Sequence, residues 1–248
     1  MMRRASMEVA LGVLAAALPA GCQTPEGAHP TRVANPRLGV MLLAVAPALN
    51  HSGSRDFDPV RVADLMASEL TYAEGVQVIP VNRVMAVLAE EGRTDIESPR
   101  HALDVVRRLG ADGIVVFAIT EYEPYDPPIV GITAQLYGRG AVDQADDPAF
   151  SGGPQTEGGA QPADVSEGDI HPIAQTQRVY DASQRYVVER VRRFAADRDA
   201  DDSPYGWRRY VVSQQHFLRF CCHAAVEELL QGTSAGAAAG APPENRVQ

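Results

Sequence analysis

The sequence predicts an α/β fold in which helices pack on one mixed sheet. Apolar runs of strand length occur at 38–45, in "VQVIPV" and in "DGIVVFAITEY", and segments with helical spacing of apolar residues separate them. After the third run, "IVGITAQLYGRG" alternates apolar and polar residues, which is typical of an antiparallel strand with one wetter face. The predicted element order is β-α-β-α-α-β-β-β-α-α.

The first helix is predicted from "DFDPVRVADLMASELTYAEG". Asp58 is a good N-cap, Pro59 suits the first helical position, and Gly75 ends the pattern. An apolar stripe of helical period faces the expected core. It consists of Val62, Leu65, Met66, Leu70 and Ala73.

Two more helices follow the second strand. "NRVMAVLAEEG" predicts a short helix capped by Asn82 and closed by Gly92. "SPRHALDVVRRLGA" repeats the pattern, with Ser98 as the cap and Pro99 at the first position. Its apolar residues are expected to face the sheet.

The C-terminal part returns to the sheet and then becomes helical. "TQRVYDAS" predicts a strand, and Asp181 or Ser183 can start the helix "SQRYVVERVRRFAAD". After a polar break, we predict one long helix from Trp207 to Gln231. Its apolar stripe includes Val211, Leu218, Cys222, Ala225 and Leu229.

Composition limits the classes of function. The net charge of −10 argues against a general nucleic-acid partner. The chain contains no lysine, so all 22 basic residues are arginine. Schiff-base chemistry and a phosphate-loop lysine are therefore excluded, and no cofactor is expected.

The N-terminus predicts export. A basic start at Arg3 and Arg4, a short apolar run and the small pair Ala20-Gly21 precede Cys22, which describes a secretory signal over residues 1–21. The pattern resembles a bacterial lipoprotein signal, in which the cysteine is diacylated and becomes the first residue of the mature chain. Simple secretion and an uncleaved anchor are the alternatives.

Composition also divides the exported chain. Residues 22–37 are rich in proline, glycine and polar residues and predict a flexible tether. A single α/β domain is expected over 38–231, interrupted by an acidic, disordered insertion at 141–175. Residues 232–248 predict a disordered tail.

The cysteines and acidic runs do not predict a metal site. Cys221 and Cys222 are adjacent, and neighbours on a helix point about 100° apart, so they are expected as buried thiols and not as ligands of one ion. The run "DRDADD" lacks the central glycine and terminal glutamate of a calcium loop. We therefore expect no bound metal.

Two groups of residues are catalytic candidates. Glu121, Glu123 and Asp126 follow a buried strand, where a carboxylate pair could serve acid–base chemistry, but a solvated strand exit is the simpler interpretation. His51 lies beside two serines in "NHSGS", yet the chain has no "GxSxG" nucleophile motif. The sequence thus predicts a protein that is not an enzyme.

Three segments carry a resemblance to a known family: "VAPALNHSGSRDFDPVRVADLMASEL", "VQVIPVNRVMAVLAEEG" and "RRLGADGIVVFAITEY". They resemble the periplasmic α/β domain shared by the curli secretion lipoprotein, the lipoprotein activators of penicillin-binding proteins and the TolB amino-terminal domain. The resemblance covers about 38–137 and implies an anticodon-binding-domain-like arrangement. It also implies an outer membrane lipoprotein that faces the periplasm.

We therefore expect a lipid-anchored, non-enzymatic envelope protein that docks to, or helps to assemble, an envelope complex. A homo-oligomeric subunit of a secretion-type assembly and an envelope hydrolase or ligand-binding enzyme are the alternatives. Arginine and tryptophan are common interface anchors. The predicted partner-binding residues are Arg185, Arg192, Arg193, Trp207, Arg208 and Arg209.

Overall fold

The computed structural model describes residues 32–35, 39–138, 170–198 and 203–236. The predicted signal peptide and Cys22 lie outside this part of the chain, as do most of the predicted tether and insertion. Within the described residues, no helix combines the length and the apolar character needed to cross a membrane.

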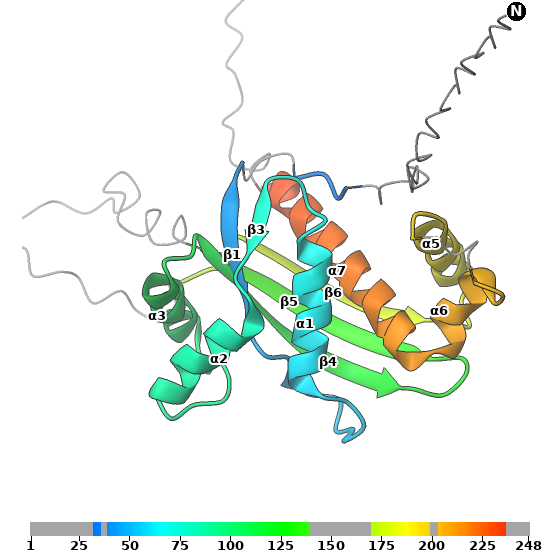
Figure 1. The fold of residues 1–248 in the computed structure, drawn as a ribbon, viewed down its shortest axis with the longest axis horizontal. Coiled ribbons are helices and arrows are strands. Elements are labelled where there is room, and N and C mark those ends of the chain that lie inside the picture. The colour runs from blue at the N-terminus through cyan, green and yellow to red at the C-terminus, as the bar shows by residue number, and fades with distance from the viewer. Residues whose placement is uncertain (1–31, 36–38, 139–169, 199–202, 237–248) are drawn as a thin grey trace, which may run out of the picture.

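The described strands form one six-stranded mixed sheet, in the order β3-β1-β4-β5-β6, with β2 also paired to β4 (Figure 1). The pairs of β1 with β3, β1 with β4 and β2 with β4 are parallel, whereas β5 is antiparallel to β4 and β6. The predicted mixed α/β fold is confirmed. The strands are β1 Met41–Val45, β2 Leu49–Asn50, β3 Val76–Val78, β4 Gly113–Glu123, β5 Ile129–Gly138 and β6 Ala174–Asp181.

One face of the sheet carries the larger core. Alternate strand positions, such as Leu43, Val115 and Ile132, pack there with the apolar sides of the covering helices. The longest helix, α7, packs on β5 and β6 and also on α1 (Figure 1). The elements on this face are α1 Pro59–Leu70, α5 Arg185–Ala196, the 3₁₀ turn η3 Gly206–Arg208, α6 Arg209–Val212 and α7 Gln214–Gly236.

The opposite face carries a smaller core under two helices, α2 Val81–Glu90 and α3 Pro99–Leu109. Ala44 and Ile114 from the sheet meet Val84 and Val105 from the helices there. In Figure 1 both helices lie toward the β1 and β3 side of the sheet. On β6 this face presents exposed polar side chains, Gln175 and Gln177. The sheet is therefore covered unevenly.

The predicted caps of α1 and α3 are present. The Asp58 carboxylate accepts hydrogen bonds from the backbone N–H groups of Val60 at 2.9 Å and Arg61 at 3.3 Å. The Ser98 hydroxyl oxygen accepts one from the N–H of His101 at 3.2 Å. Each cap satisfies helix N–H groups that would otherwise lack a partner, so the cap residue sets where the helix begins.

The predicted start of α2 is wrong. Asn82 lies inside the helix, and the N-cap is Pro80, which makes no side-chain capping bond. The Pro80 carbonyl accepts the Arg83 N–H at 2.9 Å and so closes the first turn. Because β3 ends at Val78, the chain passes almost directly from strand to helix, and the fixed φ of proline suits that junction.

The predicted continuous helix from Trp207 to Gln231 is also wrong. Ser213 is extended, with φ −98° and ψ 117°, and separates α6 from α7. Its carbonyl accepts the Phe217 N–H at 2.9 Å, which opens α7. The bend lets Tyr210 and Phe217 both enter the larger core, and α7 then continues to Gly236.

Two segments expected to be flexible contribute to the cores at their described ends. Val33, within the predicted tether, is buried and donates its N–H to the Tyr72 carbonyl at 3.1 Å. Ile170 is buried in the smaller core, and β6 begins at Ala174, inside the predicted insertion. Burial of one aliphatic side chain stabilises the fold by about 1.5–3 kcal/mol. The average composition of a segment does not show which single residue is buried in this way.

Candidate functional site

Three of the six predicted partner-binding residues come together on the surface of α5 and η3. The Arg192 guanidinium lies 4.4 Å from the centre of the Trp207 ring, and the Arg208 guanidinium lies 5.2 Å from it. Cation–π attraction of this kind holds long side chains in a defined position. We call these three residues, Arg192, Trp207 and Arg208, the arginine–tryptophan surface.

Two predicted residues lie on α5 without joining that surface through a described contact. Arg185 is almost fully exposed and pairs with Glu189 one turn along the same helix, at 3.1 Å. Arg193 is exposed in the last turn of α5, where a cation interacts favourably with the helix dipole. Both positions can be explained by the helix alone.

The sixth predicted residue, Arg209, is directed differently. Its Nη2 group donates to the Arg198 carbonyl at 2.9 Å and to the Tyr210 hydroxyl at 3.1 Å. Its Nε atom is buried and has no hydrogen-bond partner among the described residues. Arg209 therefore belongs to a second group of arginines, which lies between α5, α6 and α7.

At the base of this second group lies Glu69 of α1, whose side chain is 0% exposed. Its carboxylate accepts hydrogen bonds from Arg198 Nη2 at 2.6 Å, Arg219 Nε at 2.8 Å and His223 Nδ1 at 3.2 Å. We call Glu69, Arg198, Arg219 and His223 the Glu69 cluster. It connects α1 to α7 and to the end of α5.

The environment of Glu69 keeps it ionised. Burial raises the pKa of the Glu69 carboxyl. The hydrogen bonds from His223 and Arg219, together with the charge of Arg198, lower the pKa by more than burial raises it, so the pKa lies below its ordinary value. Arg198 is itself held between rings, 3.8 Å from the centre of Tyr72 and 5.0 Å from that of Phe194. The cluster is thus fixed by both charge and stacking.

Sequence reasoning missed the Glu69 cluster. One signal was available, since Glu69 lies on the apolar stripe of its helix, three residues after Met66 and next to Leu70. A charged residue on a buried helix face needs a partner. Arg198, Arg219 and His223 could not be identified as those partners, because they lie 129, 150 and 154 residues away.

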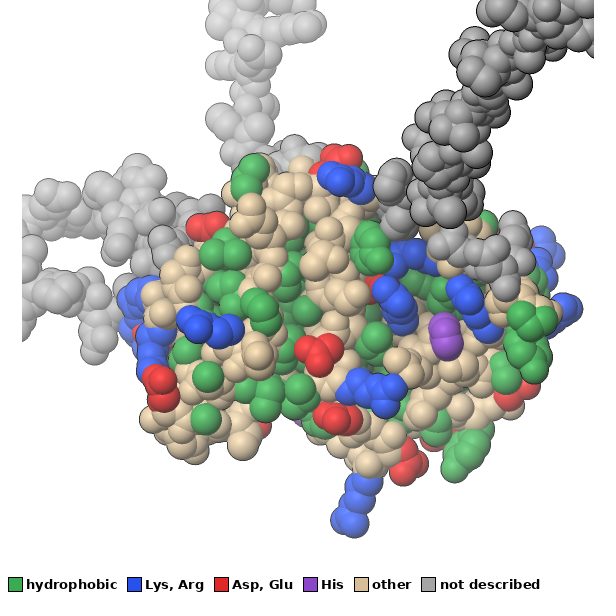
Figure 2. All heavy atoms as spheres, viewed as in Figure 1, with side chains coloured by type: hydrophobic (Ala, Val, Ile, Leu, Met, Phe, Trp, Pro, Cys, Tyr) green, Lys and Arg blue, Asp and Glu red, His purple; other side chains and the backbone are tan. Residues whose placement is uncertain are grey.

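A hollow of about 260 Å³ opens beside the Glu69 cluster. Figure 2 shows basic side chains gathered around one histidine in the region where Figure 1 draws α6 and the start of α7. We call this the arginine hollow. Its lining includes Tyr72, Arg198, Arg209, Tyr210, His216 and Arg219, together with Asp197.

A second, larger hollow of about 370 Å³ lies between α1 and the start of α7. Phe57 and Tyr122 line it and pack with ring centres 5.2 Å apart. The Tyr122 hydroxyl accepts a hydrogen bond from the Gln214 amide. Ser213 also lines this hollow, and the Ser213 hydroxyl lies 2.9 Å from His216 Nδ1.

The catalytic candidates considered from sequence do not assemble into a site. The Ser52 hydroxyl donates to Asn50 Oδ1 at 2.9 Å, and Ser54 Oγ accepts the Asp56 N–H, so both serines hold the turn together. His51 is exposed, and its backbone N–H pairs with Ile119. Exposed carboxylates at Glu121 and Glu123 lie at the end of β4.

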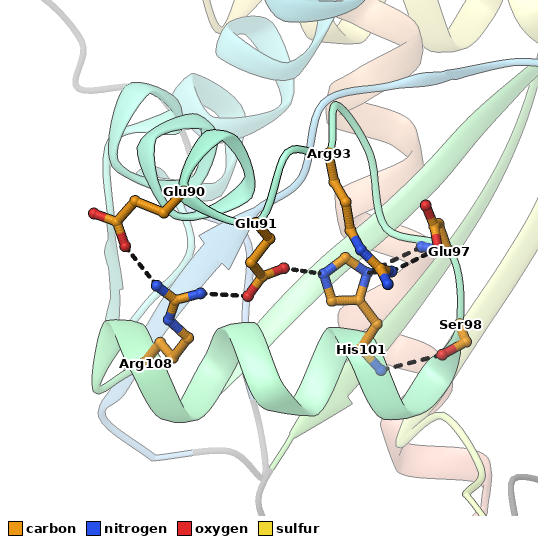
Figure 3. A network of polar contacts seen from close by, with 7 residues as sticks. All are labelled: Glu90, Glu91, Arg93, Glu97, Ser98, His101 and Arg108. Carbon is orange, nitrogen blue, oxygen red and sulfur yellow. Dashed lines mark hydrogen bonds and ion pairs between the residues drawn. The ribbon is translucent and has the colours of Figure 1, made fainter.

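Figure 3 shows another histidine–glutamate network, between the end of α2 and α3. His101 Nδ1 accepts the Glu97 N–H at 3.2 Å, which leaves Nε2–H to donate to Glu91 Oε2 at 2.8 Å. Arg108 pairs with both Glu90 and Glu91. Since both ring nitrogens are engaged, this network, the α2–α3 clamp, joins two helices and does not present a free base.

Cys221 and Cys222 are buried thiols, as the sequence predicts. Burial raises the pKa of the Cys221 and Cys222 thiols, and both side chains are in the larger core. His223 turns instead to Glu69. Within the described part of the chain, no set of three or more histidine, cysteine and acidic side chains is placed to hold a metal ion.

Comparison with known proteins gives matches among solved structures alone; no family model and no curated protein sequence matches the chain. A lipoprotein from Neisseria meningitidis matches at 15% identity and a TM-score of 0.38, over 56% of this chain and 79% of its own. The C-terminal domain of LpoB from Salmonella enterica matches at 9% identity and a TM-score of 0.40, over 60% and 87%.

LpoB from E. coli matches at 11% identity and a TM-score of 0.36, over 40% of this chain and 50% of its own, so the match spans half of that protein. These neighbours are lipoproteins, which is the kind of protein that the sequence resemblance names.

Proposed function

We propose that this chain is a non-enzymatic envelope protein, anchored by lipid at Cys22, that docks to another envelope protein through the arginine–tryptophan surface. The observation that carries the proposal is the stacking of Arg192 and Arg208, from two different elements, against one indole ring. Tryptophan and arginine are enriched among the residues that dominate binding energy at interfaces.

The charges of this surface support docking to an acidic partner. Arg192 and Arg208 form no ion pair with any described residue, in contrast to Arg185 and Arg190 on the same helix. A local group of free cations on a chain of net charge −10 gives directional attraction and disfavours general binding to anionic surfaces. We infer that the partner presents carboxylates.

Preorganisation is the second supporting argument. A free arginine side chain loses up to about 2 kcal/mol of rotamer entropy when it is fixed in an interface. Here, the indole restrains both guanidinium groups before a partner arrives. The surface therefore pays less of this cost on binding than isolated exposed arginines would.

A photocrosslinking experiment tests the docking surface. A photoreactive residue replaces the neighbouring Arg193, and crosslinking is carried out in intact cells with the Arg192→Ala/Arg208→Ala double variant as the test. Arg107→Ala is the matched control, because Arg107 is an exposed arginine on α3, which packs on the other face of the sheet. We expect one discrete adduct, reduced about tenfold or more in the double variant and unchanged in the control. Equal yields in all three proteins would reject the surface.

The lipid anchor has a separate test. We expect the intact mass of the purified chain to correspond to a protein that starts at Cys22 and carries fatty acids. Cys22→Ser should move the protein from the membrane fraction to the soluble fraction. An unmodified Cys22 thiol, or an intact leader, would overturn the anchor without affecting the docking surface.

A further inference from the structure

The arginine hollow has an excess of positive charge. Arg198, Arg209 and Arg219 line it, and two described carboxylates oppose them. Glu69 lies beneath the hollow and neutralises part of this charge through Arg198 and Arg219. Asp197 is exposed and forms no ion pair with the described residues. At least one guanidinium charge therefore remains uncompensated by the described part of the chain.

Hydrogen-bond donors are also in excess. Arg209 Nε is buried without a partner among the described residues. Arg219 uses its Nε on Glu69, and its two terminal nitrogens make no hydrogen bond within the described residues. Folded proteins pair nearly all of their buried donors, so an unpaired one beside a hollow needs an explanation. The Nε atom itself has almost no accessible surface, so the donors left for an acceptor in the hollow are Arg209 Nη1 and the two terminal nitrogens of Arg219.

The cations are held in place before any ligand binds. Arg198 lies over the rings of Tyr72 and Phe194, and Glu69 accepts from both Arg198 and Arg219. Arg209 is tied to the Arg198 carbonyl. Fixed guanidinium groups bind oxyanions well because their planar donors match carboxylate and phosphate oxygens.

His216 also lines the hollow and is affected by the charges of the arginines. Its Nδ1 lies 2.9 Å from the Ser213 hydroxyl, and its ring packs edge-on against Tyr210. Burial, followed by the charges of Arg209 and Arg219, lowers the pKa of His216. The charges of Arg209 and Arg219 thus act on the His216 ring from nearby, and the same positive potential attracts negative charge.

We propose that the arginine hollow binds a small oxyanion, a phosphate or carboxylate group, with Arg209 and Arg219 as the direct donors. Glu69 is then a positioning residue, which holds Arg198 and Arg219 from below. A volume of about 260 Å³ admits one such group with a few attached atoms, since the pockets that hold drug-sized ligands measure about 300–1,000 Å³. This proposal does not depend on the docking surface.

Titration calorimetry on the full chain in detergent tests the proposal, with inorganic phosphate and acetate as probes and sodium chloride at equal ionic strength as the reference. We expect saturable binding of one oxyanion per chain and no such signal from chloride. Arg209→Gln should weaken the binding about tenfold or more, because charge-assisted hydrogen bonds are lost. Arg185→Gln, which removes the same charge from an exposed site on α5, should leave it unchanged.

Folding is controlled by the choice of variant. Arg219→Gln also releases Glu69 and can unfold the chain. No hydrogen bond or ion pair joins Arg209 to Glu69, so Arg209→Gln is the deciding substitution. Bound phosphate should also raise the pKa of His216, measured from its ring resonances, because the anion offsets the nearby cations. An unchanged His216 titration at saturating phosphate would contradict the site.

A competition experiment distinguishes phosphate esters from free phosphate. If glycerol 3-phosphate displaces inorganic phosphate at similar concentration, the site takes phosphate esters; if it does not, the site takes the free anion.

The sequence between the described ranges carries Asp199, Asp201 and Asp202. If phosphate binds only after these three are changed to asparagine, the chain's own carboxylates occupy the hollow, and the proposal is overturned.

Discussion

The Glu69 cluster and the α2–α3 clamp use the same residue types, glutamate, histidine and arginine, but their carboxylates differ in exposure to water. The Glu69 side chain is fully buried, and its partner Arg198 is 8% exposed. In the clamp, the Glu91 side chain is 23% exposed and that of Arg108 is 40% exposed. The chemistry of the contacts is similar, so the difference in their consequences comes from access to water.

Access to water decides what happens when a partner is lost. A solvated ion pair contributes about 0–1 kcal/mol, because water replaces the missing partner. A buried pair differs, since removing one member leaves the other charge without solvent or counterion, at about 3–5 kcal/mol. The Glu69 cluster should therefore be a major determinant of the fold, and the clamp a minor one.

The largest expected effect comes from Glu69→Gln. This change keeps the shape of the side chain but removes the charge that compensates Arg198 and Arg219. We expect the free energy of unfolding, measured by urea titration, to fall by about 3–5 kcal/mol. Glu91→Gln serves as the matched change in the clamp and should cost less than about 1 kcal/mol. Similar losses in the two variants would show that burial does not separate the two networks.

An intermediate effect is expected from acid. The pKa of Glu69 is lowered in the folded state, so its stabilising contribution is present above the unfolded-state pKa, about 4.3. That contribution is lost as pH falls through the lowered folded-state value. We expect the free energy of unfolding to decrease below about pH 4.5 in the wild-type chain, with a clearly shallower slope in Glu69→Gln. Parallel slopes would mean that other carboxyls account for the acid sensitivity.

The smallest expected effect concerns salt. Arg108→Ala removes both ion pairs of the clamp and should cost about 0.5–1 kcal/mol in dilute buffer. In about 1 M NaCl, screening should remove most of this difference, whereas the loss in Glu69→Gln should persist because salt does not reach the buried cluster. A salt-independent Arg108→Ala effect would instead indicate that packing of the arginine stem is what matters.

The two networks also differ in the sequence separation of their interacting residues. The clamp joins residues 10 to 18 positions apart, within two helices whose boundaries were nearly predicted. Even so, the sequence does not predict the clamp, since the angle between α2 and α3 depends on how both pack on the sheet. The three residues of the arginine–tryptophan surface were among the six predicted partner-binding residues because arginine and tryptophan are common interface anchors. Their stacking depends on how α5 and η3 pack together.

The sequence by itself determined the local structure: the caps at Asp58 and Ser98, the alternation of β5 and the mixed α/β order. These features depend on interactions within a few residues, whose energies hold wherever the segment lies. The tertiary structure alone decided the break at Ser213, the burial of Val33 and the partners of Glu69. Each depends on desolvation by segments distant in sequence, and desolvation exists only once the chain has closed around the group.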